Sequence, residues 1–100
     1  MVLAVVLFLG WSNDTSQNTP VCTARGDQIS PQICRVKYGG TIITWQDSRG
    51  GDSDIYAQYL DALGQAQWKR NGVPVCRSAG TQTFHHVLPD GAGGVIVMWH

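Results

Sequence analysis

The sequence predicts an all-β chain, because a 54-residue pattern recurs in it and its composition disfavours helices. Aligned with itself at that offset, the chain needs no gap. The coinciding identical residues are Val21-Cys22 with Val75-Cys76, Gly26 with Gly80, Gln28 with Gln82, Gly39-Gly40 with Gly93-Gly94, Ile42 with Ile96, and Trp45 with Trp99. An internal period of this order is typical of solenoids, propellers and arrays. We therefore expect part of a repeat protein.

The composition favours strands and turns. All seven acidic residues are Asp, whose short side chain suits turns and strand ends better than helices. With 12 Gly, 43% hydrophobic residues and zero net charge, the chain fits a glycine-rich globular protein. Seven scattered Lys and Arg do not make the concentrated basic face that nucleic-acid binding requires, so no nucleic-acid partner is expected.

One period contains four expected strands, at residues 28–36, 41–45, 54–60 and 65–68. Pro31 indicates that the first strand either pairs on one side only or begins late. The second strand is apolar on both faces, as an inner strand packed between neighbouring units should be, and residues 95–99 repeat that character. Tight turns containing Gly40 and Gly94 precede these two strands, since glycine supplies the positive φ that such turns demand. Four short antiparallel strands per unit are typical of a propeller blade.

The predicted fold class is thus all-β, a fragment of a β-propeller with one four-stranded antiparallel blade plus part of a second. The expected divisions are an N-terminal segment at 1–20, a first repeat at 21–74 and a truncated second repeat at 75–100. Residues 1–9 are apolar and are too few to span a bilayer, which takes about 20 residues. They favour a secretory signal peptide, although no Lys or Arg precedes them; the alternative is a buried strand of a preceding blade. Both interpretations exclude a transmembrane helix.

Three cysteines form no C-x-x-C pair. Cys22 and Cys76 hold equivalent repeat positions, and neighbouring blades usually hold such positions too far apart for a disulfide, whose Cα atoms lie about 4.4–6.8 Å apart. We expect buried free thiols. A bridge between Cys22 and Cys34 is the alternative for an exported chain.

The loop after the second strand supplies the candidate ligand-binding residues, namely Asp47, Arg49, Asp52 and Asp54. For Asp47 and Arg49 an ion pair or capping bond that fixes the loop is favoured over ligand contact. Carboxylates at 47, 52 and 54 are Ca²⁺ ligands by type, but their spacing departs from that of a calcium loop. We therefore expect no metal and no cofactor.

Trp45 and Trp99 end matching strands, which favours core packing over sugar stacking. For Trp68 and Tyr56 packing is also favoured, with stacking on a sugar ring as the alternative. His85 and His86 have no companions at metal-ligand spacing. The sequence has no motif of a catalytic nucleophile, a zinc site or a phosphate-binding loop. Glycoside hydrolysis requires a pair of carboxylates, and because the chain has no Glu, only Asp pairs are available, none of which is marked by its neighbours. No catalytic residue is predicted.

The motifs W-Q-D-x-R at 45–49, D-I-Y-A-Q at 54–58 and D-G-x-G-G at 90–94 resemble the repeats of secreted bacterial β-propeller proteins. The resemblance covers about residues 21–100, and it implies an architecture similar to sialidase-like propellers and a secreted or cell-surface location. In the first copy, Arg35-Val36-Lys37-Tyr38 departs from the Pro-Asp-Gly-Ala of the second copy. The S-x-D-x-G-x-T-W box of sialidase blades is absent, which weakens any enzymatic implication.

The resemblance implies a non-catalytic scaffold or binding module of an exported repeat protein, with further blades of the same chain and a protein or glycan ligand as partners. One alternative is a fragment of a sialidase-like glycoside hydrolase whose active site lies on other blades. The other is a decayed gene fragment. Fold alone does not decide between them.

Overall fold

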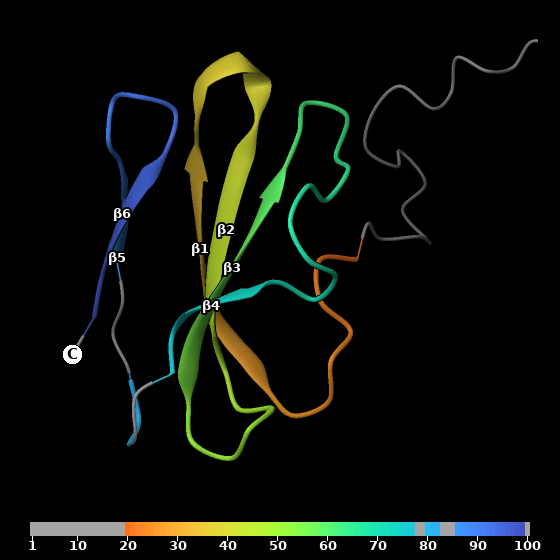
Figure 1. The fold of residues 1–100 in the computed structure, drawn as a ribbon, viewed down its shortest axis with the longest axis vertical. Helices are drawn as coiled ribbons and strands as arrows, with labels where there is room; N and C mark the ends of the chain where they lie inside the picture. Colours follow the sequence, from red (N-terminus) through yellow and green to blue (C-terminus); the bar gives the residue numbers. More distant parts are fainter. Residues whose placement is uncertain (1–19, 78–79, 83–85, 100) are drawn as a thin grey trace, which may run out of the picture.

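The computed structural model of the chain describes residues 20–77, 80–82 and 86–99, which form two antiparallel sheets (Figure 1). The strands of the first sheet are β1 (Gln28–Arg35), β2 (Thr41–Asp47), β3 (Asp54–Leu60) and β4 (Val73–Cys76). Those of the second sheet are β5 (His86–Pro89) and β6 (Val95–Met98). The one helical element among the described residues is a short 3₁₀ turn, η2 (Lys37–Gly39). The all-β prediction is confirmed.

The first sheet has the order β1-β2-β3-β4, so the apolar strand β2 lies between β1 and β3. Strand β1 is an edge strand, which agrees with the proline within it. Next to Pro31 the pairing of β1 with β2 shifts register between Ile29 and Gln32, and Ser30 has a φ of 54°. Proline thus lies at an irregularity of an edge strand, where its missing N–H costs little.

The prediction of a fourth strand at residues 65–68 is wrong. Within that segment only Ala66 makes a bridge, to Leu60, and the strand that completes the sheet is β4. Asp61 accepts hydrogen bonds from the backbone N–H groups of Leu63 and Gln65, which curls the chain into a loop. The Gln58 side chain then binds the backbone of Trp68 and Lys69 and holds the segment away from a regular strand path. The expected boundary after Pro74 therefore falls inside β4.

The second hairpin repeats the pairing of the first at the offset of 54 residues. In the first hairpin Gln32 faces Thr44 and Arg35 faces Thr41; in the second His86 faces Met98 and Pro89 faces Val95. The two intervening pairs correspond as well. The geometry of the two hairpins thus follows the same period as the sequence.

The turns of the two hairpins close with the same backbone bond but are stabilised differently. The N–H of Val36 donates to the carbonyl of Gly40 at 3.0 Å, and that of Asp90 donates to Gly94 at 3.0 Å. In the second turn the Asp90 carboxylate also accepts from the N–H groups of Ala92 and Gly94, and these two bonds hold the pKa of Asp90 below its ordinary value. The first turn has Val36 at that place and forms η2 instead. The two turns thus differ in structure where their sequences differ.

Replacing Tyr38 with Gly is expected to raise the free energy of unfolding by about 0.5–1 kcal/mol. Tyr38 has a φ of 63° and is 93% exposed, so glycine relieves strain without loss of burial. Urea denaturation measures the change. Tyr38→Ala is the control, because it removes the ring and keeps the strain; equal effects of the two variants would contradict the explanation.

The core lies in the first sheet, around β2 and β3, and includes Trp45, Ile55 and Leu60. Trp45 is 3% exposed, whereas Trp99, at the matching repeat position, is 40% exposed. The difference has a structural cause. Trp45 is covered by residues of the same sheet beyond β2, whereas the described residues of the second sheet include no counterpart of β3 or β4.

The cysteine prediction is confirmed in part. Cys22 and Cys34 are free thiols, so the alternative bridge between them is not formed. Cys34 is buried as expected, but Cys22 and Cys76 are only half-buried. The predicted signal segment lies outside the described residues except for Pro20. Within the described part of the chain, no helix has the length and apolar character needed to cross a membrane.

Candidate functional site

Asp47, at the end of β2, forms a buried ion pair with Arg49, and these are two of the four predicted ligand-binding residues. The pair is bidentate: Arg49 Nη2 lies 2.6 Å from Asp47 Oδ2, and Nε lies 2.8 Å from Oδ1. The backbone N–H of Arg49 donates to Oδ1 at 2.9 Å. Asp47 has no exposed surface, whereas the Arg49 side chain is 21% exposed. A fork-like pair of this kind fixes both side chains geometrically.

Two aromatic rings complete the environment of the pair. The Trp45 indole donates its Nε1–H to Asp47 Oδ2 at 2.8 Å. The Trp45 and Tyr56 rings stack with centroids 6.4 Å apart, and the Arg49 guanidinium lies 3.8 Å from the centroid of Tyr56. Tyr56 is thus buried beneath a cation and cannot stack on a sugar ring. We call Trp45, Asp47, Arg49 and Tyr56 the Asp–Arg cluster.

The Asp–Arg cluster also joins two distant segments of the chain. Arg49 Nη2 donates to the carbonyl of Asn71 at 2.7 Å and lies 3.4 Å from Cys22 Sγ. The Asn71 side chain in turn accepts a hydrogen bond from the N–H of Thr23 at 2.8 Å. Arg49 therefore connects its own loop after β2 with Asn71, which precedes β4, and with Cys22, which precedes β1.

Gln58, in β3 and in the D-I-Y-A-Q motif, also connects separate backbone segments by hydrogen bonds. Its side chain has no exposed surface. Nε2 donates to the carbonyl of Lys69 at 2.8 Å, and Oε1 accepts from the N–H groups of Tyr59 and Trp68, each at 3.0 Å. Gln58 thereby satisfies backbone groups of the irregular segment that replaces the predicted fourth strand.

Asp52 and Asp54, the other two predicted ligand-binding residues, do not belong to the Asp–Arg cluster. Asp52 is exposed and accepts a hydrogen bond from the N–H of Gly80 at 3.3 Å. Asp54 is half-buried at the start of β3, where it pairs across the ladder with Asp47. Among residues 20–77, 80–82 and 86–99, no three Asp, Glu, His or Cys side chains converge as a metal site would require. His86 is exposed, and His85 lies outside the described residues.

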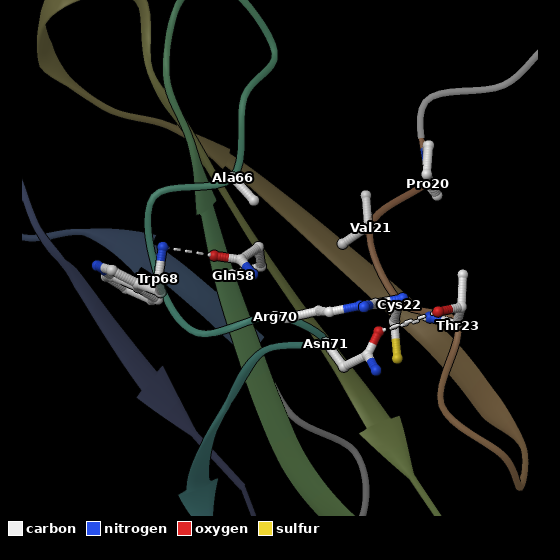
Figure 2. Close-up of a pocket in the computed structure, with 9 residues that line it drawn as sticks. All are labelled: Pro20, Val21, Cys22, Thr23, Gln58, Ala66, Trp68, Arg70 and Asn71. Carbon is white, nitrogen blue, oxygen red and sulfur yellow. Dashed lines mark hydrogen bonds between the residues drawn. The ribbon is translucent and has the colours of Figure 1, made fainter.

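A pocket of about 350 Å³ lies between the chain before β1 and the segment before β4 (Figure 2). Figure 2 shows Val21, Cys22 and Thr23 on one side and Trp68 on the other, with Gln58 between them. Trp68 is 40% exposed and packs on Tyr59, with ring centroids 6.0 Å apart. The Trp68 ring is therefore partly open to solvent. The side-chain amide of Gln58, which lies beside Trp68, is already hydrogen-bonded to the backbone of Lys69 and Trp68.

The surroundings of Asp47 lower its pKa. Burial is the largest single influence and raises it, but the hydrogen bonds from the Arg49 side chain, the Trp45 indole and the Arg49 backbone, together with the Arg49 charge, outweigh burial. The Asp47 hydrogen bond is the main cause of the raised pKa of Arg49. Both side chains are therefore charged at neutral pH, and the carboxylate is the wrong ionisation state for a general acid.

Stability is expected to fall in acid because of this pair. In the unfolded chain Asp47 has a pKa of about 3.9, and in the folded chain its pKa is lower. Its contribution is therefore fully present above the unfolded value and is lost as the pH falls through the folded value. Asp90 shifts in the same direction, so the comparison is with Asp47→Asn. Urea denaturation at a series of pH values should give a flatter profile for this variant; identical profiles would contradict the assignment.

The arrangement serves to hold the sheet together, since every polar atom of the Asp47 carboxylate is bonded internally. The sequence predicted the Asp47–Arg49 ion pair. It did not predict that Gln58 and Asn71 also hold the backbone together by hydrogen bonds. For Gln58 the available signal was its place in the D-I-Y-A-Q motif. Comparisons of the chain with protein-family models, curated proteins and solved structures found no match.

Proposed function

We propose that the chain is a non-catalytic scaffold or binding module from an exported repeat protein, built as a β-propeller fragment with a blade of four strands. The main support is that the residues of the W-Q-D-x-R and D-I-Y-A-Q motifs are engaged inside the unit. Asp47 is wholly buried, and both of its oxygens accept hydrogen bonds from Trp45 or Arg49. A catalytic carboxylate needs access to substrate, which this one lacks.

Two further features agree with the proposal. The hairpin register recurs at the 54-residue period, as repeated blades require. Each motif also has a structural role. The W-Q-D-x-R motif forms the Asp47–Arg49 ion pair, and the D-I-Y-A-Q motif supplies Tyr56, which lies under Arg49, and Gln58, which binds the backbone of Lys69. Recognition of a protein or glycan would then fall to exposed loop positions such as Asp52 and to Trp68.

The test has two parts, done on the chain as it occurs in its source. Fractionation of source cells with an antibody against the chain should place it in the surface or secreted fraction, and detection in the cytoplasm alone would contradict export. The purified chain should not turn over fluorogenic sialosides or other aryl glycosides. Turnover that survives Asp47→Asn would favour the hydrolase alternative with carboxylates elsewhere. Turnover abolished by Asp47→Asn, in a variant that circular dichroism shows to be folded, would contradict a purely structural role of Asp47.

A further inference from the structure

The pocket in Figure 2, which lies between residues 20–23 and the segment before β4, carries an uncompensated positive charge. Arg70 is the one charged side chain among the described residues that line it. Arg70 is exposed and forms no ion pair or side-chain hydrogen bond with another described residue. Figure 2 shows its side chain extending toward Cys22 and Thr23 on the opposite wall. The guanidinium of Arg49, which lies beside Cys22, adds no free charge because it is paired with Asp47.

The side-chain amide oxygens of this pocket are already bonded, whereas hydrogen-bond donors remain free. Gln58 Oε1 accepts from two backbone N–H groups. Asn71 Oδ1 accepts from the N–H of Thr23 at 2.8 Å and from the Thr23 hydroxyl at 3.3 Å. The amide nitrogen of Asn71 and the guanidinium of Arg70 donate to no described residue. Free donors with a positive charge are complementary to a carboxylate, which only accepts and can bind two N–H groups of one guanidinium.

The other part of the pocket is lined by apolar side chains. Val21 and Ala66 point into it from opposite sides, and Pro20 lies at its edge (Figure 2). A sugar ring would bring several hydroxyl donors to walls on which both amide oxygens are already bonded, and unpaired polar groups are costly. An apolar body avoids this cost and gains from burial against Val21 and Ala66. The pocket thus favours an amphipathic anion over a carbohydrate.

The size and the floor of the pocket favour a small molecule over a peptide. Its volume of about 350 Å³ is near the lower end of the range of about 300–1,000 Å³ for small-molecule sites. Peptides that bind in extended form add to a free sheet edge through main-chain hydrogen bonds. Gln58 belongs to β3, which pairs with both β2 and β4 and therefore is not an edge strand.

We infer that this pocket binds a small carboxylate with an apolar body. The guanidinium of Arg70 and the amide nitrogen of Asn71 bind the carboxylate, and the apolar body lies between Val21 and Ala66. The inference goes beyond the proposed function and does not depend on it, since the pocket is formed within the first sheet and the segments beside it. Because residues 20–23 and 66–71 are distant in the chain, a bound ligand connects two segments and should stabilise the folded state.

The test uses benzoate as the probe and benzamide as its uncharged control of the same shape. Titration of the full isotope-labelled chain, followed by NMR, should give a dissociation constant for benzoate of about 1 mM or lower, with shifts at Thr23, Ala66 and Asn71. Benzamide should bind at least about tenfold more weakly, because it lacks the charge that Arg70 recognises. Glucuronate, an acidic sugar, and acetyl-glycyl-phenylalanine, a carboxylate at the end of a peptide, should also bind at least about tenfold more weakly.

Arg70→Gln should weaken benzoate binding at least about tenfold and abolish the rise in melting temperature that benzoate gives the wild type. Ala66→Leu should also weaken binding, because it fills the pocket without a change of charge. Arg35→Gln, at an exposed arginine of β1 outside the pocket, is the matched control and should bind like the wild type. All three positions are exposed, and circular dichroism checks that each variant is folded.

A wild-type chain that does not bind benzoate at about 10 mM would overturn the inference. So would equal binding of benzamide, or equal effects of Arg70→Gln and Arg35→Gln, since either result would show that the charge of Arg70 is not recognised. Tighter binding of glucuronate or of the peptide than of benzoate would overturn the assigned ligand class. Glycoside turnover would count against the proposed function and leave the benzoate result unaffected.

Discussion

Asp47→Ala is expected to lower the free energy of unfolding by about 3 kcal/mol, near the lower end of the cost of breaking a buried ion pair. The lower end applies because Arg49 keeps 21% of its side-chain surface in water. The substitution leaves the Trp45 indole N–H and the Arg49 guanidinium without the acceptor that both share. Urea denaturation followed by tryptophan fluorescence measures the loss.

The matched control for Asp47→Ala is Asp52→Ala, in the loop that follows the same strand. Asp52 is exposed and makes one hydrogen bond of 3.3 Å, to the N–H of Gly80. We expect a change within about 0.5 kcal/mol, as for most surface substitutions. Similar losses for the two variants would mean that burial and the bidentate pair contribute little, contrary to the account given for the Asp–Arg cluster.

Gly72→Ala is expected to lower the free energy of unfolding by about 3 kcal/mol, from strained backbone and overpacking together. Gly72 has a φ of 90°, which L-residues rarely adopt. A Cβ there would lie 2.7 Å from Trp45 Cη2 and 2.9 Å from the carbonyl oxygen of Ala57. The carbonyl belongs to β3 and cannot move without disturbing the ladder, so the strain has no local relief.

Gly50→Ala is the control for this second variant. No atom lies within 4 Å of a Cβ built at Gly50, and its φ is outside the strained range. Alanine there should be neutral or should stabilise the fold by about 0.4–1 kcal/mol through the unfolded chain. Thermal and urea denaturation of both variants give the comparison. Equal effects at positions 50 and 72 would show that contact with the Trp45 ring is unimportant.

The parts of the fold that follow from side-chain alternation and turn chemistry were predictable from the sequence. The strands β2 and β3 and the glycine turn before β6 lie within a residue or two of their expected positions. The pair Asp47 and Arg49 was also predictable as an ion pair, because two opposite charges flank a tight turn. These features depend on interactions between residues close together in the chain.

The parts that failed depend on contacts between distant segments. Residues 65–68 have strand-like composition, but Gln58 binds the backbone of Lys69 and Trp68 and diverts the segment from the sheet edge. The role of Asn71 likewise depends on Arg49, 22 positions earlier. Trp99 occupies the same repeat position as Trp45 but is 40% exposed, because no counterpart of β3 or β4 covers it among the described residues. No local pattern specifies such partners.

Hydrogen exchange at the Trp45 indole tests most directly whether the W-Q-D-x-R motif forms an internal structural cluster. Its Nε1–H is buried and bonded to Asp47 at 2.8 Å, whereas Trp68 and Trp99 are each 40% exposed. Followed by NMR and assigned with Trp45→Phe, the Trp45 indole proton should exchange far more slowly than those of Trp68 and Trp99, and Asp47→Asn should speed it selectively. Exchange at Trp45 as fast as at the two exposed indoles would contradict the account.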